Sequence, residues 1–334
     1  MTKLMDNKAM DNTDNNVDNV KVDKLTSPYP YFGGKGLVAS RVWQRLGNTR
    51  NYIEPFLGSG IVLLSRPQKG NIETVNDLDG FLINFWRAVT YGDPLAIVDK
   101  LLYPVSEIDL YARHKYLKNE GKPDIDSLYN DHTYYNLDAA CYWVWGISQW
   151  IGGDWCNLNN KSVHKKRPHL SNHGQGIFQK RLFTRETLLA YITALKQRTL
   201  NVRLCCGDWH RVLNLKTIEK NGLTSIFLDP PYSNVRDANL YNNDSFDISK
   251  KVYDWALENG SNKNIRIAFC GYMSEKYFFP KEWEILQWLP FGGMANVSKK
   301  ENTRGKENKY QEFIAFSPHC LRPERQATIF ELME

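Results

Sequence analysis

The strongest constraint on the fold is a repeated pattern in which a short apolar run ends in a turn and leads into a helix. The run at residues 51–54 precedes a glycine turn and an apolar helix, and Ile72–Val75 precedes a helical pattern from about Gly80 to Val89. The run Ser225–Leu228 ends at two prolines, which leaves little room for a helix and favours a buried strand. Strands that alternate with helices predict an α/β fold built on a parallel sheet.

The pattern lapses between residues 93 and 198 and then resumes. Helical patterns occur inside this interval, near 94–102, 106–118 and 186–197. Outside it we expect helices at Leu37–Leu46 and Ile248–Asn259, and further strands at Val202–Cys206, Ile265–Cys270, Trp283–Trp288 and Tyr310–Phe316. The polar, basic stretch before the last strand, Gly292 to Lys309, is typical of a long mobile hairpin loop.

Two unusual stretches lie inside the interval. The block Tyr142–Trp155 is apolar nearly all round, so we expect most of its aromatic side chains in the core and one or two along a groove or a base stack. The stretch Asn157–Arg181 has no periodicity and predicts a mobile basic loop. Its histidines, His164, His169 and His173, lack acidic or Cys partners at ligand spacing, so we predict no metal site.

Composition excludes several other classes of protein. The longest apolar runs are too short to cross a bilayer and the N-terminus is polar, so we expect a soluble, intracellular protein. The 6 cysteines contain no Cys-x-x-Cys pair, which argues against a zinc site and a disulfide framework. Residues 1–25 are rich in Asn and Asp and predict a disordered leader, and residues 319–334 form a C-terminal tail. The net charge of +6 permits binding to nucleic acid without requiring it.

The turn Asp229-Pro230-Pro231-Tyr232 is the first candidate site. Two prolines make the turn stiff and remove two backbone donors, Asp229 adds a carboxylate acceptor, and Tyr232 adds a flat aromatic face. A planar ligand with an exocyclic amine, such as adenine, would satisfy all three groups. The alternative is that the turn only closes a strand.

Three earlier motifs point to a cofactor. Gly33-Gly34-Lys35 precedes a helix and offers backbone donors and an ammonium, without the spacing of a nucleotide-binding P-loop. Gly58-Ser59-Gly60 forms a turn at the carboxyl edge of the expected sheet, although many such turns need glycine for backbone reasons alone. An acidic residue after the second strand, Asp77, stands where a ribose diol is usually held; its alternative role is to cap the next helix.

Together and in this order, Tyr31 to Lys35, Glu54 to Gly60, Asn76-Asp77 and Asp229 to Tyr232 resemble the D12 (Dam-like, class alpha) adenine-N6 DNA methyltransferases. The resemblance covers most of residues 28 to 316. It implies an S-adenosylmethionine-dependent methyltransferase (Rossmann-like) sheet formed by 26–92 and 199–318. It also implies an inserted, mostly helical target-recognition region at 93–198.

The resemblance also assigns expected roles to residues. The catalytic group is Asp229, Pro230, Pro231 and Tyr232. The residues expected around S-adenosylmethionine are Tyr31, Gly33, Gly34, Lys35, Glu54, Phe56, Gly58, Gly60, Asp77, Asp208, Trp209 and Asp229, with Trp209 where the family has Phe. The basic residues expected to touch DNA are Lys165, Lys166, Arg167, Lys180, Arg181, Lys299, Lys300 and Arg304, for which a solvated surface loop is the alternative.

These roles imply a mechanism and a setting. Asp229 and the Pro230 carbonyl would localise the lone pair of the adenine N6 amine, and the methyl group would move in line without a covalent enzyme intermediate. The adenine would first flip out of double-stranded DNA. We expect no metal, no membrane and no obligate protein partner, and a cytoplasmic location in a prokaryotic cell or phage-infected host.

Three alternatives remain open at this stage. The amine could belong to cytosine N4, an RNA adenine or a protein glutamine, although Gly-Gly-Lys and an Asp at position 229 favour adenine N6 in DNA. The chain could also be a non-catalytic DNA-binding subunit on the same fold. A dehydrogenase is disfavoured because Gly58-Ser59-Gly60 lacks the third glycine. The block at 142–155 and the segment from Glu312 to Cys320 do not closely match the Dam recognition hairpin, so specificity for GATC is not assumed.

Overall fold

The protein is built around a seven-stranded sheet in the part of the chain that the structure describes. The structure is a computed structural model, and it describes residues 22, 24–31, 33–69, 71–150, 155–156, 168–169, 176–179, 184–231, 244–273, 277–287 and 312–323. The strands are β1 (Asn51–Glu54), β2 (Ile72–Asp77), β3 (Val202–Cys206), β4 (Thr224–Leu228), β5 (Ile265–Tyr272), β6 (Glu284–Gln287) and β7 (Glu312–Phe316).

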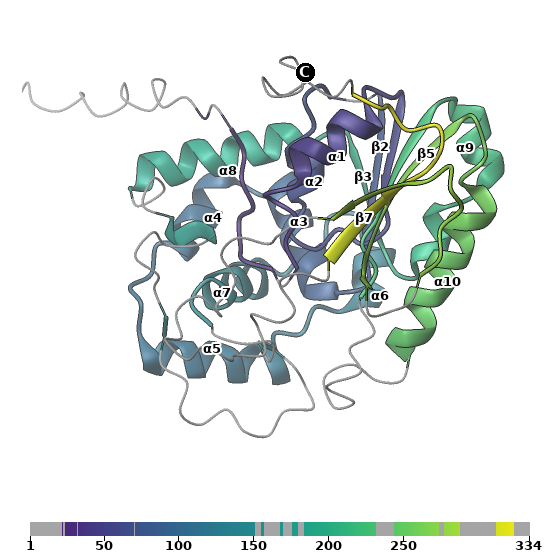
Figure 1. The fold of residues 1–334 in the computed structure, drawn as a ribbon. Helices are drawn as coiled ribbons and strands as arrows, with labels where there is room; N and C mark the ends of the chain where they lie inside the picture. Colours follow the sequence, from purple (N-terminus) through teal and green to yellow (C-terminus); the bar gives the residue numbers. More distant parts are fainter. Residues whose placement is uncertain are drawn as a thin grey trace, which may run out of the picture.

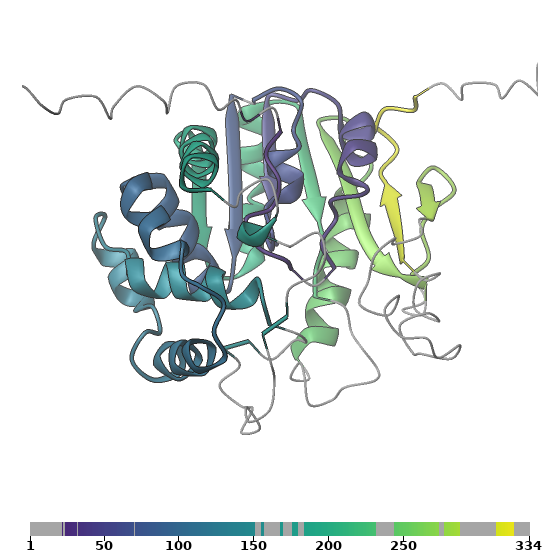
Figure 2. The same ribbon diagram turned by 90° about the vertical axis from the view of Figure 1, so that its left-hand side faces the viewer.

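The order of the strands is β3-β2-β1-β4-β5-β7-β6, as Figure 2 shows from left to right. The first five strands in this order pair in parallel, and β7 runs antiparallel to both β5 and β6. The predicted α/β fold with a mostly parallel sheet is therefore confirmed. Because parallel neighbours point the same way, the turns that follow β1, β2, β3 and β4 meet at one edge.

Both faces of the sheet are covered by helices, as Figure 1 shows. Strand β4 is buried along its whole length and alternates between two cores. Phe227 packs in a core with the N-terminal helices, whereas Ile226 and Leu228 pack on the opposite face against Val252 and Trp255. A strand buried on both faces reads as a continuous apolar run, which is why Ser225–Leu228 was recognisable in the sequence.

The helices are α1 (Ala39–Leu46), α2 (Ile61–Leu64), α3 (Gly80–Tyr91), α4 (Pro94–Leu101), α5 (Glu107–Asn119), α6 (Ile125–Asn130), α7 (Leu137–Ile147), α8 (Arg185–Thr199), α9 (Leu215–Asn221) and α10 (Asp244–Asn259), with 3₁₀ turns η1 (Gly176–Phe178) and η3 (Trp209–Val212). Polar side chains start several of them: Asp79, Asp93 and Ser106 each accept a hydrogen bond from a backbone N–H in the first turn of α3, α4 and α5. Helices α6 and α9 were not predicted, because each is shorter than two turns and has a single buried apolar residue.

Helices α4 to α8 come from the interval where the strand pattern lapsed, and α4, α5, α7 and α8 form one group with α3. In Figure 1 this group lies to the left of the sheet. The aromatic block 142–155 begins inside α7, and Trp143, Trp145, Trp150 and Trp155 are buried, which confirms that most of its aromatics belong to the core. Residues 151–154 and most of Asn157–Arg181 lie outside the described residues.

A buried ion network attaches α8 to the sheet. The carboxylate of Glu73 on β2 accepts hydrogen bonds from Arg198 of α8, at 2.6 and 2.9 Å, and from Arg66, at 3.1 Å. Both guanidinium groups also donate to backbone carbonyls, of Thr49 and Leu63. Since buried charges are tolerated only when they are paired and hydrogen-bonded, this network fixes one end of the helical group to the core of the sheet.

Candidate active site

The turns at the carboxyl ends of β1, β2 and β3 are tied together by Asn76. Its backbone carbonyl accepts from Leu57 N at 2.9 Å, and its side-chain Nδ2 donates to the carbonyls of Pro55, at 3.0 Å, and Gly207, at 2.9 Å. The next residue, Asp77, accepts from Gly207 N through its own carbonyl at 3.0 Å. One short polar segment at the end of β2 therefore sets the spacing of both neighbouring turns. The sequence offered Asn76 only as part of a motif, and its role in joining three strands was missed.

The glycine turn after β1 has the backbone that its residues predict. Gly58 has φ 47° and Gly60 has φ 68°, a region that residues with a Cβ rarely adopt. A Cβ on Gly60 would also lie 2.8 Å from the ring of Trp86, and one on Gly58 would lie 3.0 Å from the ring of Tyr31. Glycine is thus required at both positions, and Tyr31 lies directly over the turn.

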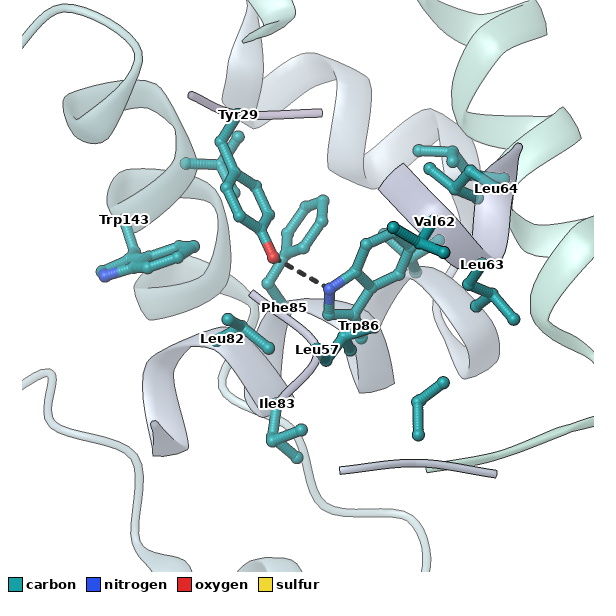
Figure 3. Close-up of a cluster of buried hydrophobic side chains, with 14 of the residues drawn as sticks. Tyr29, Leu57, Val62, Leu63, Leu64, Leu82, Ile83, Phe85, Trp86 and Trp143 are labelled. Atoms are coloured by element: carbon teal, nitrogen blue, oxygen red, sulfur yellow. Dashed lines mark hydrogen bonds between the residues drawn. The ribbon is translucent and has the colours of Figure 1, made fainter. Parts of the chain in front are cut away.

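Tyr29 supports the glycine turn through its hydroxyl group, and it was not among the predicted site residues. Its hydroxyl donates to the carbonyl of Gly58 at 2.9 Å and accepts from Nε1 of Trp86 at 2.9 Å, as Figure 3 shows for the second bond. The ring is fully buried and packs edge-on against Trp143 and Phe85. The Pro-x-Pro segment that holds Tyr29 was visible in the sequence, but nothing there indicated a contact with residue 58.

The two acids after β2 have different roles. Asp77 accepts from Gly58 N at 2.9 Å and from Asp79 N at 3.0 Å, so its carboxylate lies beside the glycine turn. Asp79 caps α3 by accepting from Phe81 N at 2.9 Å. The capping role that was the alternative for Asp77 therefore belongs to Asp79. Burial raises the pKa of both carboxyl groups, and the charge of Asp77 helps to raise that of Asp79 to about 6.

Asp208 and Trp209 follow β3 and lie near the same turns. The ring of Trp209 stacks with that of Phe56, at 6.2 Å between centroids and 27° between planes. Asp208 is exposed and accepts from His210 N at 2.9 Å, which starts the 3₁₀ turn η3. The structure thus brings Phe56, after β1, and Trp209, after β3, into contact with each other.

The ammonium of Lys35 contacts the carboxylate of Asp229 at the end of β4. The distance from Nζ to Oδ2 is 2.9 Å, and Nζ also donates to the carbonyl of Gly33 at 2.7 Å. The side chain of Lys35 is 2% exposed and that of Asp229 is 20% exposed. The Gly-Gly-Lys motif and the proline turn, almost 200 residues apart in the sequence, therefore form one site.

The electrostatics of this pair depend on several neighbours. Burial alone would lower the pKa of the Lys35 ammonium, but the charge of Asp229 and, less strongly, that of Glu312 offset it, and the pKa is raised above its usual range. Burial raises the pKa of Glu54 to about 8, against a hydrogen bond from Tyr52 and with help from the charge of Asp229. Glu54 is buried, and its Oε2 accepts from the Tyr52 hydroxyl at 2.8 Å.

The structure describes only some of the remaining predicted site residues. Pro230 is buried and Pro231 is half-buried directly after Asp229, whereas Tyr232 lies outside the described residues. Gly33 and Gly34 lie in the turn before Lys35, and the N–H of Gly34 donates to the carbonyl of Tyr31 at 3.1 Å. The basic residues expected at DNA also lie outside the described residues, namely Lys165, Lys166, Arg167, Lys180, Arg181, Lys299, Lys300 and Arg304.

The described residues contain neither a metal-binding cluster nor a membrane-spanning helix. No group of three or more His, Cys, Asp or Glu side chains there is arranged to hold a metal ion. Within the same residues, no helix has the length and apolar character needed to cross a membrane.

Comparison with known proteins agrees with the geometry of the site. Residues 31–264 match the model of the family described as D12 class N6 adenine-specific DNA methyltransferase. The chain is also 26% identical over 210 residues to the Type II methyltransferase M.MjaIII of Methanocaldococcus jannaschii, a match that covers 60% of this chain and 66% of that relative. Because the family match spans well over half of the chain, the protein belongs to the D12 class of N6 adenine-specific DNA methyltransferases.

Proposed function

We propose that this protein transfers a methyl group from S-adenosylmethionine to N6 of a flipped-out adenine in double-stranded DNA. The observation that carries the proposal is the contact between Lys35 and Asp229, at 2.9 Å. It joins the motif before α1 to the stiff proline turn after β4, at the edge of the sheet where the glycine turn also lies.

Asp229 and the proline turn have the chemistry to hold an exocyclic amine. The lone pair of adenine N6 is delocalised into the ring, which makes it a poor nucleophile. A carboxylate oxygen of Asp229 and the carbonyl of Pro230 would accept its two protons, localise the lone pair and orient it. Tyr232 would stack on the base and recover part of the few kcal/mol spent on unstacking it. Alignment of the reactants would supply much of the acceleration.

The turns around Gly58 fit the shape and polarity of S-adenosylmethionine. Gly58 and Gly60 adopt positive φ angles in the turn after β1, and Asp77 beside that turn supplies a carboxylate for a ribose diol. Tyr31 and Lys35 would hold the methionine end, and Phe56, Asp208 and Trp209 the adenine end. When bound, the cofactor would supply a methyl group activated by a sulfonium.

We assign DNA recognition to the helical region and the basic segments. Helices α4, α5, α7 and α8 form a group beside the sheet, and residues 93–198 would constitute the target-recognition region inserted into a catalytic domain of 26–92 and 199–318. Lysines and arginines at 165–167, 180–181 and 299–304 would neutralise phosphates. A DNA substrate implies work in the cytoplasm of a prokaryotic or phage-infected cell.

The direct test is to sequence DNA methylated by the purified protein and to compare two substitutions of Asp229. Asp229→Ala removes both acceptors and should lower the single-turnover rate by at least about 100-fold. Asp229→Asn keeps one acceptor oxygen and should retain measurable activity. Asp254→Ala, an exposed acid on α10, is the matched control and should behave as wild type.

Each competing function predicts a different result. Methylation of cytosine N4 or RNA would appear as the wrong modified base or as activity on RNA alone. A non-catalytic DNA-binding subunit would bind DNA and show no heat of binding with S-adenosylmethionine in calorimetry. Near-normal activity in folded Asp229→Ala protein would refute the assigned role of the turn.

A further inference from the structure

Glu312 is a buried carboxylate that none of the predicted site motifs includes. It is the first residue of β7 and lies beyond residues 31–264, the part matched by the family model. In the register of the sheet it pairs with Tyr272 at the end of β5, and β5 pairs with β4, which ends just before Asp229. Glu312 therefore lies at the same edge of the sheet as the Lys35–Asp229 pair.

The surroundings of Glu312 leave its charge poorly compensated by hydrogen bonds. Its side chain is 8% exposed, Oε1 accepts from the Tyr272 hydroxyl at 3.2 Å, and Oε2 has no hydrogen-bond donor among the described residues. A carboxylate withdrawn from water in this way is costly unless a cation lies close by.

Lys35 is the cation to which Glu312 is coupled. Burial raises the pKa of Glu312, and Lys35 opposes that rise more strongly than any other neighbour. Conversely, Glu312 helps to raise the pKa of Lys35, which is only 2% exposed and contacts Asp229. The charge of Lys35 thus acts on two carboxylates, that of Asp229 in direct contact and that of Glu312 through space.

This sharing has a consequence for catalysis. Suppose that Asp229 were the sole counter-charge of Lys35. The ammonium would then lose part of its compensation whenever the N–H groups of a bound amine engaged the negative charge of Asp229. A second buried carboxylate keeps Lys35 protonated during that change. Lys35 can then continue to hold one oxygen of Asp229 in place.

We propose that Glu312 is a positioning residue of the methyl-transfer site, which acts as the second counter-ion of Lys35 and so fixes the orientation of Asp229. This inference rests on the proposed function, since it concerns the residue assigned to hold the target amine. It involves no contact between Glu312 and the base.

The test compares Glu312→Gln with wild type across a range of pH. Gln keeps the size of the side chain and removes its charge, so the pKa of Lys35 should fall. The alkaline limb of the single-turnover rate should then move to lower pH by about one unit, so that the rate measured on that limb falls ~10-fold, with little change in KM for DNA. The Cε resonance of Lys35 in protein labelled with ¹³C-lysine, assigned with Lys35→Met, reports the pKa of Lys35 without activity.

The other ionisable groups near Lys35 are the same in both proteins. Asp229, Cys270 and Tyr272 lie at this edge, and Cys270 stays a thiol because burial raises its pKa. Glu54, with a pKa of about 8, also titrates within the range of the assay. Their contributions cancel in the comparison of the variant with wild type.

Two control variants separate charge from structure. Glu284→Gln, on the neighbouring strand β6, removes a carboxylate that pairs with Arg45 and should leave the alkaline limb unchanged. Tyr272→Phe removes the hydroxyl bound to Oε1 but keeps the charge of Glu312, so the pKa of Lys35 should stay raised.

The outcomes are distinct. A lower pKa of Lys35 together with a shifted alkaline limb in Glu312→Gln supports the proposal. An unchanged pKa of Lys35, or an equal loss of rate at every pH, overturns it. If wild type forms no N6-methyladenine, the proposed function fails, and the titration of Lys35 still decides whether Glu312 is its counter-ion.

Discussion

Replacing Tyr29 with Phe removes one oxygen atom from the support of the glycine turn. That oxygen donates to the carbonyl of Gly58 and accepts from Nε1 of Trp86, both at 2.9 Å, and the ring around it is fully buried. The substitution keeps the ring and its contacts with Phe85 and Trp143, so its effect isolates the hydroxyl.

The magnitude follows from the two bonds. A buried hydrogen bond contributes about 1 kcal/mol net, and a buried donor or acceptor left without its partner costs about 1–3 kcal/mol. We therefore expect the free energy of unfolding to fall by about 2–4 kcal/mol. At roughly 2 °C per kcal/mol for a chain of this size, the melting temperature should fall by about 4–8 °C.

The same substitution should weaken cofactor binding, because the carbonyl of Gly58 would no longer be held. A loss of about 1 kcal/mol in preorganisation corresponds to a Kd for S-adenosylmethionine about five-fold higher, which isothermal titration calorimetry can measure. Tyr191→Phe is the matched control, because Tyr191 is also fully buried and its hydroxyl donates to a backbone carbonyl, that of Thr26, at 2.5 Å. It should lower the melting temperature and leave the Kd unchanged.

Either of two results would refute this reasoning. An unchanged melting temperature and Kd in Tyr29→Phe would show that the two bonds do not support the turn. Equal changes of Kd in Tyr29→Phe and Tyr191→Phe would show that the effect on the cofactor is a general consequence of lost stability.

Two further predictions concern the stability of the fold. The pKa of Glu54 is raised from 4.5 to about 8, so the native state keeps this proton while the unfolded chain releases it, and stability should fall as pH rises through that window. In urea unfolding at several pH values, the free energy of unfolding of Glu54→Gln relative to that of wild type should rise by up to about 1.4 kcal/mol per pH unit across this window. A difference that stays constant with pH would contradict the raised pKa. Glu73→Gln leaves Arg66 and Arg198 buried without a counter-charge and should cost about 3–5 kcal/mol, whereas Asp254→Asn in the exposed Lys250–Asp254 pair should cost less than about 0.5 kcal/mol.

Local patterns predicted the elements of this fold well because the physical causes are local. Strands β4 and β5 are buried on both faces, so Ser225–Leu228 and Ile265–Cys270 appear as apolar runs in the sequence. Gly58 and Gly60 have positive φ angles, a conformation for which glycine is the usual residue, so their presence in the sequence already indicated the turn. The short helices α6 and α9 were missed because each is shorter than two turns and buries a single apolar residue, so neither shows a long apolar stripe.

The candidate site shows the same division. Asp229, Lys35 and Asp77 were chosen from motifs, and the structure brings Lys35 and Asp229 together and Asp77 to the glycine turn. Neither Tyr29 nor Glu312 stands in a motif that identifies its partner. Tyr29 contacts Gly58, which is 29 positions away in the sequence, and Glu312 contacts Tyr272, which is 40 positions away. The periodicity of a sequence does not reveal contacts over such separations.

Local sequence patterns were sufficient to predict the α/β class, the turns at the strand ends and the residue types that could hold an amine and a cofactor. Those properties depend on backbone stiffness, apolar periodicity and the chemistry of single side chains. The pairing of buried charges is set by the three-dimensional fold instead: Lys35 lies with Asp229 and Glu312 at one edge of the sheet, and Glu73 lies with Arg66 and Arg198 in its core. The physical reason is that the energy of a buried charge depends on every charge within a few ångströms, and the order β3-β2-β1-β4-β5-β7-β6 sets those distances.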